Sequence, residues 1–373
     1  MSALFEALSA RQGAVVEDAA IVHFGDPMRE QRNLVTGSAV TLVSDRRVIE
    51  VAGEDRLTWL DSITSQALTQ LRPGESTELL ILDPQGRVEH AAGVLEDGSS
   101  AWLIADAPDA EGLVSWLQRM VFRSRATVSI RADLDLLGFF SGAAAEAVVT
   151  SAAAAPNGVP LVWADPWPAV QAGGHQYSQV SPHPAAEYQW RLAIVEADAA
   201  ASAVSDLEVA GLIAADALRV AAWRPRWTSE VDERSLPHES DWIRTAVHLN
   251  KGCYRGQETV SKVHNLGHPP RRLAALHLDG SDDVLPAIGS AVFAGDSEVG
   301  RITSAARHFE DGPIALAILS RRAPMGDLVV HADGVEIAAA QQAIVPADAG
   351  ATADVPRLTR LSRRPEGQDP RKA

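Results

Sequence analysis

The chain has 373 residues, which is too long for a single ordinary core and predicts two or three domains. Its 46% hydrophobic and 22% charged residues are typical of a soluble globular protein. The formal net charge of −16 argues against a general affinity for nucleic acid or anionic membranes. One cysteine excludes an intrachain disulfide, and one thiolate cannot hold an iron–sulfur cluster by itself.

Neither a signal peptide nor a membrane span is expected. Residues 1–6 lack a basic segment followed by an apolar one. No window approaches the roughly 18 consecutive apolar residues of a membrane helix. We therefore expect a cytoplasmic protein with neither nucleic acid nor a membrane as a partner.

Residues 1–145 have the pattern of an α+β domain built from hairpins. Helices are predicted at 57–71 and 110–120, where apolar residues recur at helical spacing. The segment Asp83-Pro84-Gln85-Gly86 is a strong turn signal between two strands. Strands are predicted at 40–43, 48–51, 78–82, 87–94, 101–105, 128–130 and 134–139.

Residues 146–270 are expected to form a second α+β domain. An alanine-rich helix is predicted at 187–200, and a capping box at Ser205–Glu208 predicts the start of another. Residues 219–240 are rich in tryptophan, arginine, glutamate and histidine without a regular period, which indicates an ordered loop. Such a loop either binds a ligand or covers core edges, and the sequence favours neither.

From residue 271 the pattern is all-β. Short strands separated by glycine-containing turns predict a small barrel over residues 271–345. Residues 346–373 are polar and arginine-rich and contain prolines, so we expect a disordered tail.

The single cysteine lies in the most distinctive stretch of the chain. This octapeptide consists of Lys251, Gly252, Cys253, Tyr254, Arg255, Gly256, Gln257 and Glu258. Its glycines allow a tight turn or the close approach of a ligand, and its two cations would favour a thiolate if they lie close to the sulfur. The pattern predicts a reactive thiol at Cys253. The alternative is a small buried hydrophobic side chain.

Several histidines surround the octapeptide in the sequence. Their spacing matches no metal-ligand pattern, so no metal site is predicted. They are His238, His248, His264, His268 and His277.

The octapeptide resembles the signature of the YgfZ proteins. These are folate-binding relatives of the glycine-cleavage T-protein, an aminomethyltransferase, and are tied to the maintenance of iron–sulfur enzymes. Weaker resemblances follow in the same order along the chain, from about residue 15 to about residue 340. They lie at 53–60, 84–88, 121–125 and 298–304.

The resemblance implies two α+β (ferredoxin-like) domains and a six-stranded β-barrel around a central folate-binding channel. It implies tetrahydrofolate, or a one-carbon derivative, as the ligand. Folate and iron–sulfur enzymes or cluster-assembly proteins are the implied partners. The folate would lie against residues 219–239, with Lys251 as a cation for its glutamate tail. The expected folate contacts are Arg219, Trp223, Glu230, Glu239 and Lys251.

The chain also departs from the T-protein pattern. That pattern has a carboxylate and a glycine where this chain has Ala221 and Trp223, and an acidic pair where Glu89-His90 stand. Transfer of a one-carbon unit needs a carboxylate that handles charge on the folate nitrogens. The departure argues against aminomethyl transfer. It fits the YgfZ proteins, which generally lack the acidic pair.

Three functions remain open. The first is a folate-binding protein of iron–sulfur cluster assembly or repair that acts through the thiol of Cys253, and it is not expected to be a conventional enzyme. The second is a folate-dependent aminomethyl or methyl transferase. The third is a non-enzymatic folate-binding scaffold in which Cys253 only packs.

Overall fold

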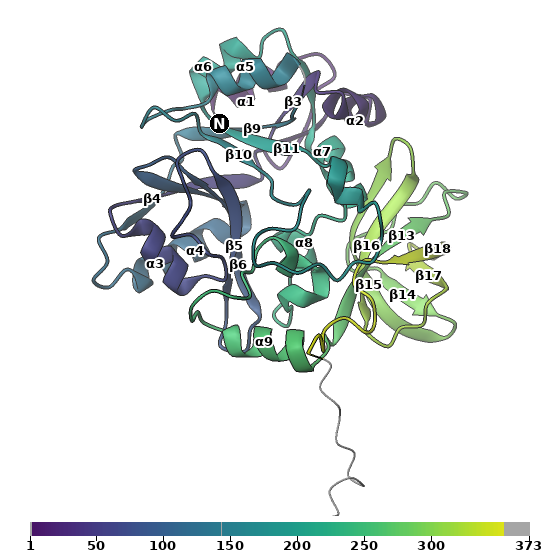
Figure 1. The fold of residues 1–373 in the computed structure, drawn as a ribbon. Coiled ribbons are helices and arrows are strands. Elements are labelled where there is room, and N and C mark those ends of the chain that lie inside the picture. Colours follow the sequence, from purple (N-terminus) through teal and green to yellow (C-terminus); the bar gives the residue numbers. More distant parts are fainter. Residues whose placement is uncertain (1, 143, 354–373) are drawn as a thin grey trace, which may run out of the picture.

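A computed structural model describes residues 2–142 and 144–353. In this part of the chain it forms two five-stranded sheets, a closed six-stranded barrel and a small N-terminal hairpin of β1 (Val15–Glu17) and β2 (Ala20–His23). The two sheets and the barrel form three lobes around a common centre (Figure 1). Mixed α/β lobes and a C-terminal barrel confirm the predicted fold class.

The first sheet has the strand order β10-β11-β9-β3-β12. Alternating apolar residues of β9 and β11 pack against helices on its outer face, where Phe139, Val149 and Val195 are buried. Its strands are β3 (Ala39–Leu42), β9 (Leu134–Phe140), β10 (Val162–Ala164), β11 (Trp190–Glu196) and β12 (Glu208–Ala210). The outer helices are α1 (Ala3–Ser9), α5 (Ala144–Ala152) and α6 (Ala197–Ala203), and α2 (Pro27–Val35) and α7 (Leu212–Ala221) lie towards the barrel.

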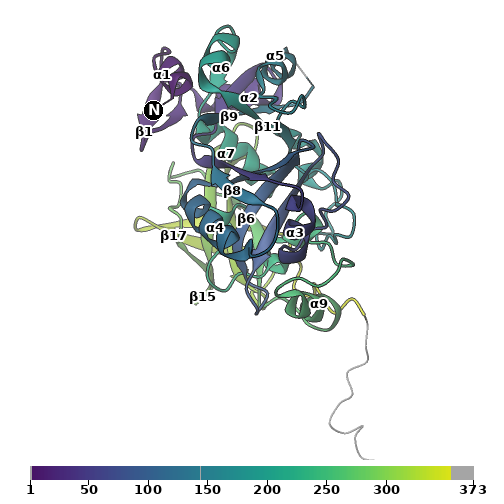
Figure 2. The same ribbon diagram turned by 90° about the vertical axis from the view of Figure 1, so that its left-hand side faces the viewer.

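The second sheet has the order β5-β6-β7-β4-β8. Two helices cover its outer face, α3 (Arg56–Ile63) and α4 (Ala107–Met120) (Figure 2). The apolar face of α4 buries Ala110, Leu113 and Leu117, as its helical spacing predicts. The strands are β4 (Arg46–Ala52), β5 (Ser76–Leu82), β6 (Val88–Glu96), β7 (Ser100–Asp106) and β8 (Thr127–Ile130).

The barrel closes in the order β13-β16-β15-β14-β17-β18. Alternating burial along β17 places Leu328, Val330 and Ala332 inside, which is the period-two pattern of a strand with one buried face. Its strands are β13 (Arg271–Leu278), β14 (Ala291–Ala294), β15 (Ser297–His308), β16 (Gly312–Ser320), β17 (Asp327–Ala332) and β18 (Val335–Ala343). The barrel strands lie within residues 271–343.

The boundary predicted near residue 145 does not separate the two sheets. Strands β3 and β4 are neighbours in the sequence but belong to different sheets, and β9 returns to pair with β3. The second sheet is thus one continuous segment inserted into the first. The sequence predicts strands at 40–43 and 48–51, but it does not indicate that they belong to different sheets, because their partners β9 and β7 lie far along the chain.

Three further predictions need correction. Residues 187–200 contain strand β11 before the short helix α6, because tryptophan, leucine, isoleucine and valine precede the alanine run. The capping box at Ser205–Glu208 starts no helix, and Glu208 begins β12. The helix predicted at 57–71 ends at Ile63, the last residue of α3, and helix α9 (Gln257–Leu266) begins within the octapeptide.

The predicted disordered tail lies mostly outside the described residues. Its first part, residues 346–353, is described and bonds to the end of α9, where Thr352 N–H donates to the carbonyl of His264 at 3.0 Å. Residues 354–373 lie beyond the described range.

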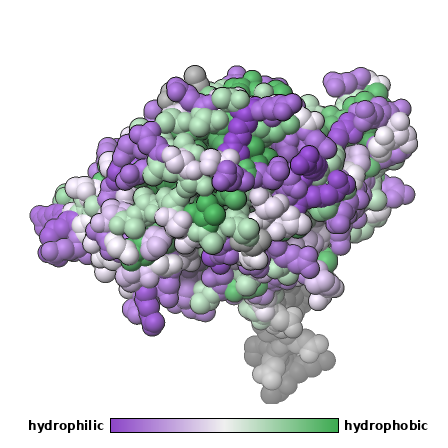
Figure 3. All heavy atoms as spheres, turned by 90° about the horizontal axis from the view of Figure 1, so that it is seen from above, coloured by the Kyte–Doolittle hydropathy of each residue, from purple (hydrophilic) through white to green (hydrophobic). Residues whose placement is uncertain are grey.

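The described residues include no helix that is long and apolar enough to cross a membrane. The face above α5 and α6 shows an area of weakly apolar residues with hydrophilic residues around it (Figure 3).

Helix α9 is held by a group of aromatic and imidazole side chains. The Nε2–H of His238, in the 3₁₀ helix η2 (Pro237–Ser240), donates to the carbonyl of Val260 at 3.1 Å. His264 Nδ1 and Tyr177 Oη share a hydrogen bond of 3.0 Å. Burial lowers the pKa of His238 to about 3. Burial also raises the pKa of Asp241, which accepts from the Tyr177 N–H, to about 7.

These shifts predict that acid destabilises the fold. Burial and the charge of Arg244 lower the pKa of His183 to about 4. In the unfolded chain, His183 and His238 would bind protons near pH 6.5, whereas in the folded protein both stay neutral at that pH. Stability therefore falls as the pH drops below about 6.5. Asp241 acts in the opposite sense, because the folded protein takes up its proton first.

We expect the free energy of unfolding, measured in urea by tryptophan fluorescence, to fall between pH 7 and pH 5. The variant His238→Gln should lessen this fall, because it removes a group that the unfolded chain protonates first. Asp241→Asn should steepen the fall, because it removes a group that the folded protein protonates first. A stability that rises on acidification would contradict the assignment.

Candidate functional site

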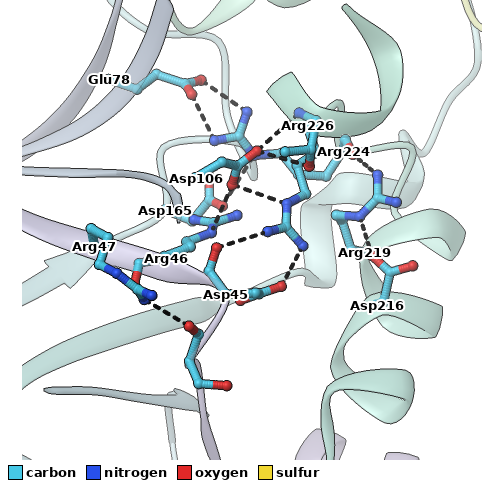
Figure 4. Close-up of polar contacts among 12 residues, drawn as sticks. Asp45, Arg46, Arg47, Glu78, Asp106, Asp165, Asp216, Arg219, Arg224 and Arg226 are labelled. Carbon is cyan, nitrogen blue, oxygen red and sulfur yellow. Dashed lines mark hydrogen bonds and ion pairs between the residues drawn. The ribbon is translucent and has the colours of Figure 1, made fainter. Parts of the chain in front are cut away.

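Three arginines after the start of α7 join the three lobes (Figure 4). Arg224 bonds Glu78 of the second sheet at 2.6 Å and Asp165, which follows β10 of the first sheet, at 3.1 Å. Arg226 bonds Asp45 at 2.7 Å and Asp106 at 3.0 Å. Burial opposes the charge of Arg224, but Asp165 and Glu78 offset it and raise its pKa.

Arg219 extends this network to the barrel. It bonds Asp216 at 2.6 Å, Glu230 at 3.2 Å and the Oγ of Ser304 on β15 at 2.7 Å. Ser304 Oγ donates in turn to Glu230 at 2.6 Å. Arg219 and Glu230 were both expected to contact folate. The structure brings them together, but as an ion pair with each other.

The other expected folate contacts are also engaged within the protein. Trp223 is buried, with a backbone φ of +60°, and its ring lies 5.4 Å from that of His183. Glu239 is buried and accepts from Arg271 at 2.8 Å. Burial raises the pKa of Glu239, although Arg271 lowers it. One oxygen of Glu239 has no hydrogen-bond partner among the described residues.

The centre between the two sheets is filled by side chains. The central core cluster contains six tryptophans: Trp102, Trp163, Trp167, Trp190, Trp223 and Trp242. The cavity bounded by these sheets and residues 224–227 measures only ≈30 Å³. Sites for drug-sized ligands have volumes of about 300–1,000 Å³. This cavity is therefore too small to hold a folate.

Lys251, the first residue of the octapeptide, holds the end of helix α3. Its Nζ donates to the carbonyls of Thr64 at 2.9 Å and Gln66 at 2.7 Å, and also to that of Asp61. The Nζ also lies over the ring of Tyr254, 5.5 Å from the ring centre. Burial lowers the pKa of Lys251, against the effect of Asp61. This ammonium group satisfies helix-end carbonyls rather than a ligand's carboxylate.

The rest of the octapeptide packs against the turn between β5 and β6. Gly256 has φ +84° and lies so close to this turn that a β-carbon would be 2.6 Å from the carbonyl oxygen of Asp83. Arg255 pairs with Glu89 at 2.6 Å. Gln257 donates to the carbonyl of Lys251 at 3.2 Å. Glu258 is exposed at the start of α9.

Cys253 itself is exposed and is a free thiol. It follows Gly252, which has open space where a β-carbon would lie. Both cations expected beside the sulfur, Lys251 and Arg255, are committed to other partners. The loop therefore presents a thiol to solvent from a backbone fixed on both sides.

Sequence reasoning missed the acids of the network, Glu78, Asp165 and Asp106. Each stands at a strand or strand end, where a single acid gives no local signal. The dense run of arginines and tryptophans at 219–227 was the only hint of a buried ionic network. Among residues 2–142 and 144–353, no group of three or more histidine, cysteine, aspartate or glutamate side chains is placed to hold a metal ion.

The two glycines of the octapeptide provide a matched test of its packing. We expect Gly256→Ala to lower the free energy of unfolding by about 2 kcal/mol or more, because the left-handed backbone and the contact with Asp83 both oppose a β-carbon. Gly252→Ala should change it by less than about 0.5 kcal/mol. Urea unfolding of both variants measures the difference, and equal effects would contradict the packing.

Lys251 gives a second test. Lys251→Met removes the donor to three carbonyls and should cost about 1–3 kcal/mol of stability. Lys262→Met, an exposed lysine on α9, is the control and should stay within about 0.5 kcal/mol. A Lys251→Met variant as stable as the control in thermal and urea unfolding would rule out the anchoring role.

No model of a protein family matches the chain. A stretch of 98 residues is 31% identical to a chloroplastic protein of Arabidopsis thaliana that is provisionally named a transferase, and this match spans 25% of the chain and 21% of that protein. The crystal structure of the glycine cleavage system aminomethyltransferase T from Bartonella henselae superposes with a TM-score of 0.70 at 17% identity, over 90% of this chain and 95% of that one. The chain therefore has the fold of that aminomethyltransferase.

Proposed function

We propose that this chain is a folate-binding protein that supports the assembly or repair of iron–sulfur proteins through the thiol of Cys253. The observation that carries the proposal is the exposed thiol on an octapeptide that is otherwise fixed in place. An accessible cysteine on a rigid loop can react with, or transiently bond, a group on another protein. The fold likeness and the resemblance of the octapeptide support the same proposal.

The thiol serves in one of three ways: as a redox-active group, as a transient ligand, or as the partner in a mixed disulfide. The chain has a single cysteine, so any disulfide it forms joins it to a second molecule. The partner proposed here is an iron–sulfur enzyme or a cluster-assembly protein, and the proposed compartment is the cytoplasm, where thiols stay reduced.

A second candidate is a folate-dependent aminomethyl or methyl transferase. The fold of the Bartonella aminomethyltransferase and the provisional name of the Arabidopsis protein favour it. Ala221 stands where the T-protein pattern has a carboxylate, and the centre has no room for the substrate. Turnover of a methylamine-loaded lipoyl carrier with tetrahydrofolate would establish this activity.

The role of the thiol is tested in cells that lack the protein. Cys253→Ala should fold normally, because the side chain is exposed, and should fail to restore the activity of a dependent iron–sulfur enzyme. Asn250→Ala, an exposed change in the same loop, should restore it fully. Full restoration by Cys253→Ala would refute the proposal.

Thiol labelling separates the proposal from the scaffold alternative. Native Cys253 should react with a thiol reagent nearly as fast as in the unfolded chain, because it is exposed. Labelling at the slow rate of a buried cysteine would favour the scaffold.

A further inference from the structure

A groove lies between the barrel and the segment that joins α8 (Trp227–Glu230) to η2. This barrel groove has a volume of ≈410 Å³, which is within the range of small-molecule sites. Its floor is apolar and comes from both sides of the groove. The floor residues are Val231, Ile288, Val299, Ile302 and Ile318.

The walls of the barrel groove are fixed by contacts already in place. Arg271 on β13 joins Asp232 at 2.6 Å and Glu239 at 2.8 Å, which holds the joining segment to the barrel. At Gly300 a β-carbon would lie 2.3 Å from the carbonyl oxygen of Ile318, so β15 and β16 approach closely there. A preformed groove binds a ligand without the cost of ordering its walls.

The acids that line the groove are used within the protein. Glu230 bonds Arg219 and Ser304, and Asp232 bonds Arg271. Their charges are therefore compensated before any ligand arrives.

Two arginines at the rim are different. The side chains of Arg234 and Arg301 are 70% and 66% exposed. Among the described residues, they pair only with exposed Glu233 at 3.7 Å and Glu298 at 3.2 Å. Exposed pairs of this kind contribute at most about 1 kcal/mol. Both guanidinium groups are thus free to turn to a ligand carboxylate, which they can bind in a bidentate manner.

We propose that the barrel groove binds the p-aminobenzoyl-glutamate portion of the folate. The aromatic ring lies on the apolar floor, and the glutamate carboxylates meet Arg234 and Arg301. This inference rests on the proposed function, and it moves the ligand from the filled centre between the sheets to the side of the barrel.

Calorimetric titration of the full chain with tetrahydrofolate and with p-aminobenzoylglutamate tests the inference. Both should bind in a saturable manner. The double variant Arg234→Gln/Arg301→Gln and the single variant Ile288→Asp should each weaken binding by about tenfold or more, which corresponds to about 1.4 kcal/mol. These residues are exposed, so the variants should unfold at the same urea concentration as the unaltered chain.

Arg119→Gln is the matched control, because it removes an exposed arginine on α4 whose side chain bonds Ser115. It should leave both affinities unchanged. If the groove variants bind tetrahydrofolate as tightly as the unaltered chain, the barrel groove is not the binding site, and the proposed function still stands. An unaltered chain that does not bind tetrahydrofolate would overturn both.

Discussion

The buried ion pairs of Arg224 are the constraint on which the arrangement of the lobes depends. Its guanidinium group joins Glu78 of the second sheet to Asp165 beside the first. Removing one partner of a buried pair leaves an uncompensated charge, at a cost of about 3–5 kcal/mol. Arg219 and Arg226 repeat this pattern towards the barrel and towards α4. These ion pairs hold the two sheets close enough that buried side chains fill the space between them.

This constraint explains why residues expected to bind a ligand lie in the interior. Arginine and glutamate side chains that could hold a folate are the same groups that can pair with each other once they are buried. The tryptophans of the central cluster complete the packing around them. In this chain, the fold shared with an aminomethyltransferase encloses buried ion pairs and tryptophans.

Much of the architecture was predictable from the sequence, and the reasons are local. The helical spacing in α4 and the turn signal between β5 and β6 depend only on neighbouring residues, and both predictions are confirmed. The short strands near the C-terminus predicted a barrel, and a closed barrel is present there. The sheet membership of β3 and β4 could not be predicted, because it depends on pairing with β9 and β7, far along the chain. The same reason hid the acids of the buried network.

The octapeptide shows how far a motif can be interpreted. Its composition indicated an accessible thiol, and Cys253 is exposed. Its cations were expected beside the sulfur, yet Lys251 holds α3 and Arg255 pairs with Glu89. A charge pattern does not say which partner each long side chain reaches, because that depends on elements distant in the sequence.

The insertion of the second sheet into the first has a consequence for folding. Residues 46–130 form all five strands of the second sheet, so their contacts are comparatively local and this unit can form while the chain is still being synthesised. The first sheet is complete only when β12 pairs in parallel with β3, across the whole inserted segment. Closing so large a loop is entropically costly, and the order of synthesis therefore makes the first sheet the later of the two to form.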